Sequence, residues 1–482
     1  MALPLNIKWL LNPPNELIKY DILISEDKPL NETIPVIEPA SHWLQINIDR
    51  NGIYSVYFTK ALKYEIPKNV NEITIPTMLS SYDIEVNAVG IDLGTTECCA
   101  AVIRKNGPDF VVLDEVTRLR TMPSYVSFDE ENDKCGQIVV NRMRHQSKYT
   151  VYDIKRIIGK KFDEVIVDSL WPFKVVPQNE NGSEVRIETK TFDNKHQLKT
   201  PEGIAAVLVK HMKTCLEAYQ GQSLKSAVIT IPSEFTEAQV KATATAADLA
   251  GWENIDFLPE PIAAAFAYFS EINIPKNSII TICDCGGGTV DICIAKVTKN
   301  QIKILSHAGD PYLGGRDFDK LLFNYFVQKV KDEINFDIME SDKKYVLKQK
   351  CQDIKHTLSA TNEDFIDIDD FDSEKDGIIK ISREKFETMA TGLMDRFQAI
   401  ILQTVTKANQ IHYVFQVGGG CRMPMIKNIL SKIFPDAKHQ CNVNPDWVVA
   451  HGAALYDYHL KTNNQFGGWR LTVAKALAYV SK

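Results

Sequence analysis

The spacing of apolar residues changes character near residue 87. Beyond that point, continuous apolar runs of strand length alternate with longer helical stretches. This pattern predicts strands at Ala227–Ile231 and Ile279–Cys283, and helices over 202–219 and 236–251. Strands that alternate with helices are typical of a layered α/β fold.

Residues 1–86 follow a different pattern, in which apolar and polar positions alternate with a period of two. Leu44, Ile46 and Ile48 are followed by an Asn-Gly turn at 51–52 and a second run, Ile53–Phe58. The pattern predicts a small β-rich N-terminal extension. No residue combination in it indicates chemistry, so a packing extension and a recognition appendage both remain open.

One strand-to-turn segment occurs twice. Val89–Thr96 and Ile282–Thr289 both read as a strand that ends in aspartate and continues into a turn of glycine and threonine. Their aspartates, Asp92 and Asp284, are 192 residues apart. Two copies at this separation predict two similar lobes that face each other across a cleft.

The two turns have the composition of a phosphate site. Glycines let backbone N–H groups approach phosphate oxygens without a Cβ in the way, and threonine hydroxyls add donors. Asp291 follows Thr289 by two residues, so it projects to the same face if the strand continues. Three carboxylates near a polyphosphate predict magnesium, held largely through water.

A third glycine-rich turn, Val417–Pro424, follows the apolar run Tyr413–Val417 and precedes a helix predicted at Met425–Ile433. Glu260 and Pro261, read as the end of another strand, add one more carboxylate. The P-loop pattern and the His-Glu-x-x-His pattern are absent from the sequence. P-loop nucleotide hydrolysis and zinc hydrolysis are therefore set aside.

Composition limits the partners. The 482-residue chain is 44% apolar and carries a net charge of −7, without a basic block. These values indicate a globular protein and argue against nucleic acid as a partner. The ten cysteines lie mostly in apolar runs without CxxC pairs, which favours buried reduced thiols. No membrane span is predicted, and Met1–Pro14 lacks the unbroken apolar core of a signal peptide.

Together these segments resemble, in order and spacing, the nucleotide-binding domain of the heat shock 70 kDa family. The resemblance covers residues 88 to about 458 and rests on Gly90–Thr96, Asp153–Gly159, Ala227–Pro232, Glu260-Pro261, Asp284–Asp291, Gly314–Asp319, Val417–Pro424 and Asn444–Asp446. It implies an actin-like ATPase (ribonuclease H-like) fold with two lobes around a nucleotide cleft. The expected domains are the extension 1–86, the ATPase domain 87–460 and a tail 461–482 with no peptide-binding domain.

The resemblance also implies the roles of individual residues. The expected catalytic residues are Lys155, Asp92, Asp284, Thr289, Asp291 and Glu260, of which Asp92 and Asp284 orient hydrated Mg²⁺. The residues expected to bind ATP or ADP are Gly94, Thr95, Thr96, Gly286, Gly287, Gly288, Gly314, Gly315, Lys355, Ser359, Gly418, Gly419, Arg422 and Asp446. Potassium is a further candidate cation.

Several positions depart from the family pattern. Around the nucleotide, these are Glu97 and Glu234 in place of aromatic residues, Gln352 in place of glutamate, His356 in place of arginine, and Gly420-Cys421 in place of a Ser-Thr pair. The phosphate chemistry is expected to be intact and base binding altered. Asp256 stands where relatives that respond to J-domain co-chaperones carry arginine, which argues against stimulation by J-domain proteins.

The leading interpretation is an ATP hydrolase that acts as a chaperone-like switch, most similar to the microsomal, ATPase-core-only stress-seventy proteins. A nucleotide-binding module with little hydrolysis is the alternative, and a metabolite kinase on the same fold is disfavoured. The expected partners are proteins that respond to lobe motion, with a nucleotide exchange factor among the candidates. The expected compartment is the cytoplasm, with the endoplasmic reticulum of the core-only relatives as the alternative.

Overall fold

The computed structural model describes residues 72–463, apart from 77–78, 179–181, 300, 407, 409 and 442. N-terminal to them it describes only the backbone of the strands between Pro4 and Glu65. The chain divides into two compact units, Met1–Lys63 and Tyr64–Lys482. The predicted tail 461–482 lies outside the described residues beyond Asn463, and so does the predicted turn at 51–52.

The N-terminal unit contains short antiparallel strands. One pair is formed by β1 (Pro4–Lys8) and β2 (Lys19–Leu23), and a three-stranded sheet by β3 (Asn31–Pro35), β4 (His42–Ile48) and β5 (Tyr54–Lys60). Strands β4 and β5 cover the two segments where the period-two pattern predicts strands. The role and the boundary of this extension stay predictions.

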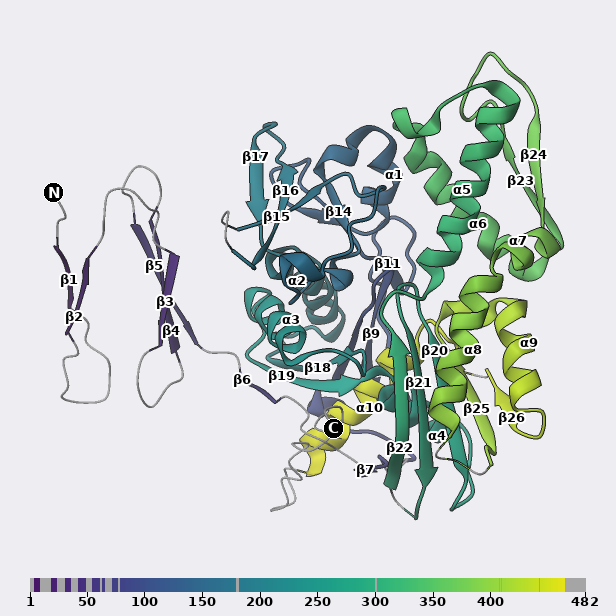
Figure 1. Ribbon diagram of the computed structural model, residues 1–482. Coiled ribbons are helices and arrows are strands. Elements are labelled where there is room, and N and C mark those ends of the chain that lie inside the picture. The colour runs from purple at the N-terminus through teal and green to yellow at the C-terminus, as the bar shows by residue number, and fades with distance from the viewer. Residues whose placement is uncertain are drawn as a thin grey trace. The chain divides into compact units, whose positions relative to one another are not determined.

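The first sheet of the larger unit has the strand order β10-β9-β8-β18-β19 (Figure 1). Strands β8, β9 and β10 are antiparallel neighbours, whereas β18 runs parallel to β8 and β19 parallel to β18. The bounds are β8 (Val89–Leu93), β9 (Glu97–Arg104), β10 (Gly107–Phe110), β18 (Ser226–Ile231) and β19 (Asn254–Pro259), with β11 (Thr121–Pro123) paired to β9.

The second sheet repeats this order as β22-β21-β20-β25-β26, with the same sequence of antiparallel and parallel pairs. Its strands are β20 (Ile279–Cys285), β21 (Val290–Val297), β22 (Gln301–Asp310), β25 (Tyr413–Val417) and β26 (Lys438–Gln440), and β7 (Glu72–Thr74) pairs with β22 at its edge. The repeated turn motif therefore corresponds to a repeated arrangement of strands.

The two helices predicted in the first half are α2 (Pro201–Gln220) and α3 (Glu237–Leu249). Helix α2 begins where the Thr200 side chain accepts a bond from the Gly203 amide, and it ends at Gly221, whose φ is 71°. Helix α3 begins with a capping box between Thr236 and Gln239. Local capping chemistry thus sets both helix starts.

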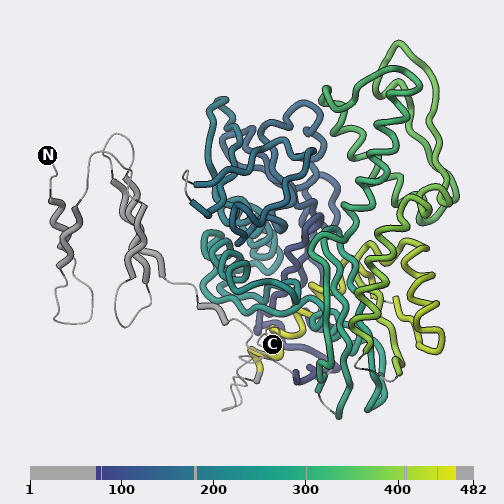
Figure 2. Tube along the Cα trace, in the orientation of Figure 1, coloured from purple at the N-terminus to yellow at the C-terminus, as the bar shows by residue number. Residues whose placement is uncertain are grey.

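Two buried helices pack against strands of both large sheets. Helix α4 (Glu260–Glu271) and helix α10 (Val448–Asn463) pack together closely, since a Cβ on Gly452 would lie only 1.6 Å from the carbonyl oxygen of Ala263. One hydrophobic core contains residues of both helices together with Val228 of β18 and Ile282 of β20. Helix α10 also packs on β8, since a Cβ on Gly90 would lie 2.2 Å from the Ala454 nitrogen, and Figure 2 shows the yellow C-terminal trace next to the purple start of the coloured trace. The two sheets therefore share one core.

The remaining helices and the smaller sheets lie around the two large sheets (Figure 1). The helices are α1 (Gln137–Gln146), α5 (Gly315–Ile334), α6 (Lys343–Ala360), α7 (Arg383–Met389), α8 (Thr391–Val405) and α9 (Pro424–Ile433). The smaller sheets are formed by β12 (Tyr125–Ser127), β13 (Lys134–Cys135) and β14 (Thr150–Tyr152); by β15 (Lys174–Pro177), β16 (Val185–Lys190) and β17 (His196–Lys199); and by β23 (Glu363–Asp367) and β24 (Ile378–Ser382).

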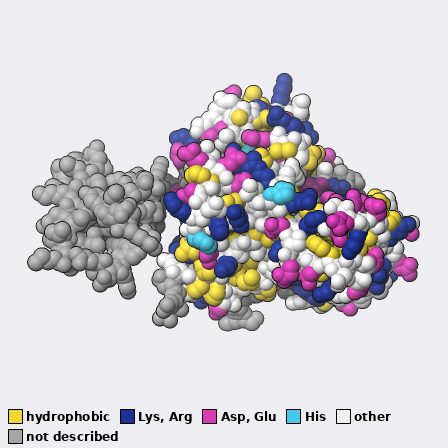
Figure 3. All heavy atoms as spheres, turned by 90° about the horizontal axis from the view of Figure 1, so that it is seen from above, with side chains coloured by type: hydrophobic (Ala, Val, Ile, Leu, Met, Phe, Trp, Pro, Cys, Tyr) yellow, Lys and Arg dark blue, Asp and Glu magenta, His cyan; other side chains and the backbone are white. Residues whose placement is uncertain are grey.

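The state of the cysteines and the mixed surface charge agree with what the composition predicts. All ten cysteines are free thiols, and seven of them are buried, as predicted. On the face of the described region seen in Figure 3, basic and acidic side chains are interspersed. Among the described residues, no helix has both the length and the apolar character that a membrane crossing requires.

Candidate functional site

The two predicted phosphate turns face each other at van der Waals distance. A Cβ on Gly287 would lie 2.1 Å from Thr96 Oγ1, and a Cβ on Gly288 would lie 2.6 Å from Thr95 Cγ2. Contacts this short exclude any side chain at either glycine. The glycines of the second turn are therefore required for the threonines of the first turn to approach.

The segment before α5 closes on the second turn. The Gly315 amide donates to the Gly286 carbonyl at 3.0 Å, and a Cβ on Gly314 would lie 2.7 Å from the Gly288 nitrogen. The Arg316 amide donates to the Gly287 carbonyl at 2.8 Å. Residues 314–316 thus fix the backbone of the second turn in place.

Four carboxylates converge beside these turns. Asp92 and Asp284 are near the ends of β8 and β20, Glu260 is the first residue of α4, and Asp291 is directly opposite Asp284 in the β20–β21 ladder. The sequence reading of Glu260 as a strand end needs a small correction, because β19 already ends at Pro259. The proline at the second position of α4 suits a helix start, where its missing N–H is not needed.

The protonation of these carboxylates reflects their crowding. Desolvation and the charge of Glu260 raise the pKa of Asp92 to about 7, although Lys155 opposes the shift. Desolvation and Glu260 likewise raise the pKa of Asp291 to about 8 and that of Asp284 well above its usual value. Asp291 Oδ1 is buried without a hydrogen-bond partner among the described residues. Oxygen donors in this state fit a hard divalent cation such as Mg²⁺, which would relieve the repulsion between them.

Lys155 is a buried cation that lies among these carboxylates. It lies in the 3₁₀ turn η3 (Ile154–Arg156), and its Nζ donates to Glu260 Oε1 at 2.6 Å. The side chains of the pair are only 9% and 8% exposed. Burial alone would lower the pKa of Lys155, but the charges of Glu260 and Asp92 raise it, so the ammonium stays protonated.

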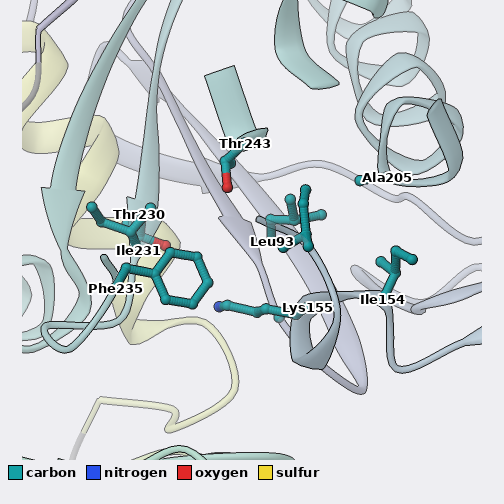
Figure 4. Close-up of a pocket in the computed structure, with 10 residues that line it drawn as sticks. Leu93, Ile154, Lys155, Ala205, Thr230, Ile231, Phe235 and Thr243 are labelled. Atoms are coloured by element: carbon teal, nitrogen blue, oxygen red, sulfur yellow. The ribbon is translucent and has the colours of Figure 1, made fainter. Parts of the chain in front are cut away.

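Apolar side chains hold the stem of Lys155. A cavity of about 10 Å³, room for about one water molecule, is lined by Lys155 and by Leu93, Ile154, Ile231 and Phe235. Figure 4 shows the lysine side chain among these residues. Apolar packing along the stem limits the positions that the ammonium group can take.

The residues expected to bind the nucleoside surround the third glycine-rich turn. Gly418 has a φ of 76°, and a Cβ there would lie 2.7 Å from Asp284 Oδ1, so this turn lies against the second phosphate turn. Arg422 forms an ion pair with Asp446 at 2.7 Å, and a Cβ on Gly419 would lie 3.5 Å from Asp446 Oδ1.

Helix α6 supplies the other two predicted nucleoside residues, Lys355 and Ser359. Lys355 Nζ forms an ion pair with Asp319 at 2.8 Å and donates to the Gly315 carbonyl at 3.1 Å. Ser359 donates to the carbonyl of Lys355 within its own helix. The structure thus links Lys355 to the phosphate turns, whereas the Ser359 hydroxyl is engaged locally.

The residues that depart from the family pattern are described by their pKa values and hydrogen bonds. Desolvation raises the pKa of Glu97 to about 8, although Arg316 opposes the shift. Partial desolvation and the neighbouring Lys355 cation lower the pKa of His356, so this residue is neutral at pH 7. Gln352 accepts a long bond from Arg316 Nη1 at 3.4 Å.

Sequence reasoning missed two arginines that connect the two halves of the larger unit, the half that contains the first sheet and the half that contains the second sheet. Arg156 Nη2 donates to the Gly288 carbonyl at 3.0 Å and to Asp317 Oδ2 at 2.9 Å. Arg316 is buried and forms an ion pair with Asp153 at 3.2 Å. Both arginines lie inside motifs that the sequence had singled out, Asp153–Gly159 and Gly314–Asp319. A charged residue between motif positions was the signal that could have identified them.

Comparison with known proteins places the chain in a family. A family model described as Hsp70 protein matches residues 88–478, which extends past the C-terminal limit expected from the motifs. The chain is 34% identical to the heat shock 70 kDa protein of Neurospora crassa over 376 residues, which is 76% of this chain and 57% of that relative. It is 32% identical to heat shock cognate 70 kDa protein 3 of Dictyostelium discoideum over 385 residues, 77% of this chain and 60% of the relative.

The matched region is therefore less than two thirds of the length of these relatives. It contains the facing turns, the buried lysine and the converging carboxylates described above. On this match, the chain belongs to the Hsp70 family, whose members are ATPases.

Proposed function

We propose that this chain binds ATP with Mg²⁺ between the facing turns and hydrolyses it to ADP and phosphate. One observation carries the proposal: a buried, charged lysine lies within a group of carboxylates beside two glycine-threonine turns at contact distance. The turns of the two sheets would hold the β- and γ-phosphates through backbone N–H groups and the hydroxyls of Thr95, Thr96 and Thr289. Phosphoryl transfer requires mainly positioning and charge stabilisation, which this arrangement supplies.

Each residue of the site has a defined task in this proposal. Asp92 and Asp284 would orient the water shell of Mg²⁺, which neutralises phosphate charge when it is bound. Lys155 would stabilise charge on the γ-phosphate, and Glu260 would hold the lysine in position at 2.6 Å. Asp291, opposite Asp284, would orient the attacking water.

The test is a single-turnover assay with limiting ATP. The chain should form ADP when Mg²⁺ is present and should form none after chelation. Lys155→Met should lower the rate about 100-fold or more, the loss typical of removing one transition-state charge contact. Lys161→Met, an exposed lysine six positions further along, is the matched control and should keep the rate. Equal rates in both variants would refute the assigned mechanism.

A second candidate function is a nucleotide-binding module that scarcely turns ATP over. It is favoured by the nucleoside side of the site, where His356 is neutral at pH 7 and Glu97 has a pKa of about 8. Calorimetric ATP and ADP binding without ADP formation in the single-turnover assay would establish this function in place of hydrolysis.

We further propose a switch role in which nucleotide-driven motion of the two halves acts on protein partners. A nucleotide exchange factor fits this role, whereas Asp256 argues against stimulation by a J-domain protein. The cytoplasm is the proposed compartment, because ten free thiols suit a reducing environment. Imaging of the tagged full chain would test the compartment, with the endoplasmic reticulum as the competing outcome.

A further inference from the structure

A cavity of about 320 Å³ adjoins the proposed catalytic residues. Thr95, Lys155, Thr289 and Asp291 form its inner wall. Its outer wall comes from the loop between β18 and α3, at residues 232–236, and from the end of β22 with the loop that follows it, at residues 310–312. None of the residues expected to bind the nucleoside lines it. The cavity therefore meets the phosphate site from a side other than that of the nucleoside.

The lining suits an oxyanion. Three cations, Lys155, Arg156 and Lys160, contribute to it together with the hydroxyls of Thr95, Thr236, Thr289 and Tyr312. Two of the acidic lining residues are engaged elsewhere: Asp310 pairs with Arg396 at 2.5 Å, and Glu164 accepts the Lys161 amide at 2.9 Å. The three cations also bond to Glu260, Asp317 and the Tyr312 hydroxyl. Each cation has further N–H donors, which together with the hydroxyls could hold phosphate oxygens.

Two cross-links between the halves close the outer side. Oε1 of Glu234, in the β18–α3 loop, lies within hydrogen-bond distance of Nδ1 of His307 on β22, at 3.0 Å. Lys160, just after η3, donates to the Tyr312 hydroxyl at 2.7 Å and lies 4.5 Å from the centre of the Tyr312 ring. The Glu234 side chain is 36% exposed and that of His307 is 26% exposed, so this pair is at the boundary with solvent.

We propose that this cavity is a transient binding site for inorganic phosphate and its exit path after hydrolysis, with the Glu234–His307 pair as the gate. The proposal rests on the proposed ATP hydrolysis. Hydrolysis breaks the bond between the β–γ bridging oxygen and the γ-phosphorus, and water supplies the new oxygen of the phosphate. The Glu234 carboxylate would hold the two halves together at the cavity mouth and repel the departing anion. Lys160 would attract the anion from the catalytic wall toward that mouth.

The experiment measures two steps in the full-length chain. Rapid quench reports ADP formation, and a fluorescent phosphate sensor reports phosphate in solution. Glu234→Gln should raise the rate of phosphate release relative to ADP formation about two- to fivefold, the size expected from loss of a carboxylate charge at a partly exposed contact. Lys160→Met should slow release relative to ADP formation. Glu237→Gln is the matched control, since this exposed residue lies outside the cavity lining.

A third measurement tests the site without turnover. Titration of inorganic phosphate into the Mg–ADP complex, followed by ³¹P NMR, should show binding that Lys160→Met weakens and Glu237→Gln leaves unchanged. ADP formation with the same release rate in all variants would overturn the exit path while the proposed hydrolysis stands. Absence of ADP formation in the quench assay would refute the proposed hydrolysis and the exit role together.

Discussion

Replacement of Lys155 tests stability and catalysis at the same time. Its ammonium is 2.6 Å from Glu260, and both side chains are at least nine-tenths buried. Lys155→Met keeps the apolar stem and removes only the charge. Glu260 is then left as a buried carboxylate without its cation, next to Asp92 and Asp284, whose charges already act on one another.

The expected magnitude follows from this geometry. At an effective dielectric constant of about 20, two unit charges this close attract by roughly 6 kcal/mol, against which the desolvation of both groups must be set. Removing one partner of a buried pair typically costs about 3–5 kcal/mol. This is a large part of the roughly 5–15 kcal/mol that stabilises an ordinary domain. We therefore expect Lys155→Met to lower the free energy of unfolding by about 3–5 kcal/mol at pH 8.

The double variant Lys155→Met with Glu260→Gln separates the two effects. Because it removes the unpaired carboxylate, it should be more stable than Lys155→Met alone by about 2 kcal/mol or more, the cost of a buried unpaired charge. Its hydrolysis should remain as low as that of the single variant.

The assay is urea unfolding at pH 8, with Lys161→Met as the control and single-turnover hydrolysis measured in parallel. If the double variant lost the sum of the two single losses, Lys155 and Glu260 would not be coupled in solution. The assignment of Glu260 as the residue that positions the lysine would then be wrong.

Three further predictions follow from the site. Asp284→Asn should lower single-turnover hydrolysis at least tenfold and weaken Mg²⁺ dependence, because it removes a carboxylate charge expected to orient the metal. His356→Arg should tighten ADP binding several-fold in calorimetry, since a permanent cation over the base would replace a neutral ring; unchanged affinity would contradict the expectation that His356 alters base binding. Without ligand, the free energy of unfolding should fall as pH rises from about 4 to 8 in urea titrations, because Asp92 and Asp291 have folded-state pKa values of about 7 and 8, above their unfolded values, so the folded protein binds more protons there. Added Mg–ADP should reverse this slope.

Much of the fold was predictable because its signals are local. The helix expected over 202–219 is α2, since Thr200 caps its start and Gly221 its end. The apolar run Tyr413–Val417 forms strand β25 with the same limits. Membership of the Hsp70 family implies the actin-like ATPase fold, which agrees with the mixed α/β architecture. Motif order and spacing therefore identified the family before any tertiary contact was known.

The contacts between distant segments could not be predicted in the same way. Glu260 is 105 residues from Lys155 in sequence, yet the Lys155 ammonium lies 2.6 Å from the Glu260 carboxylate. Arg316 and Asp153 are 163 residues apart and both are buried. Sequence patterns report local periodicity and turn chemistry, whereas such pairs depend on how the two sheets pack. The roles of the individual site residues accordingly stay predictions, although the structure brings most of them together.

The repeat of the two sheets is not symmetric where the chemistry is proposed. In the second sheet Asp284 faces Asp291 across the ladder, whereas in the first sheet Asp92 faces Cys99. The first half compensates with Lys155 and with Glu260, which α4 places beside it. One half thus contributes the cation and the other half an additional carboxylate, so neither half holds a complete set. Any motion that separates the facing turns would remove Lys155 from Asp284 and Asp291, and the proposed hydrolysis would therefore depend directly on closure of the cleft.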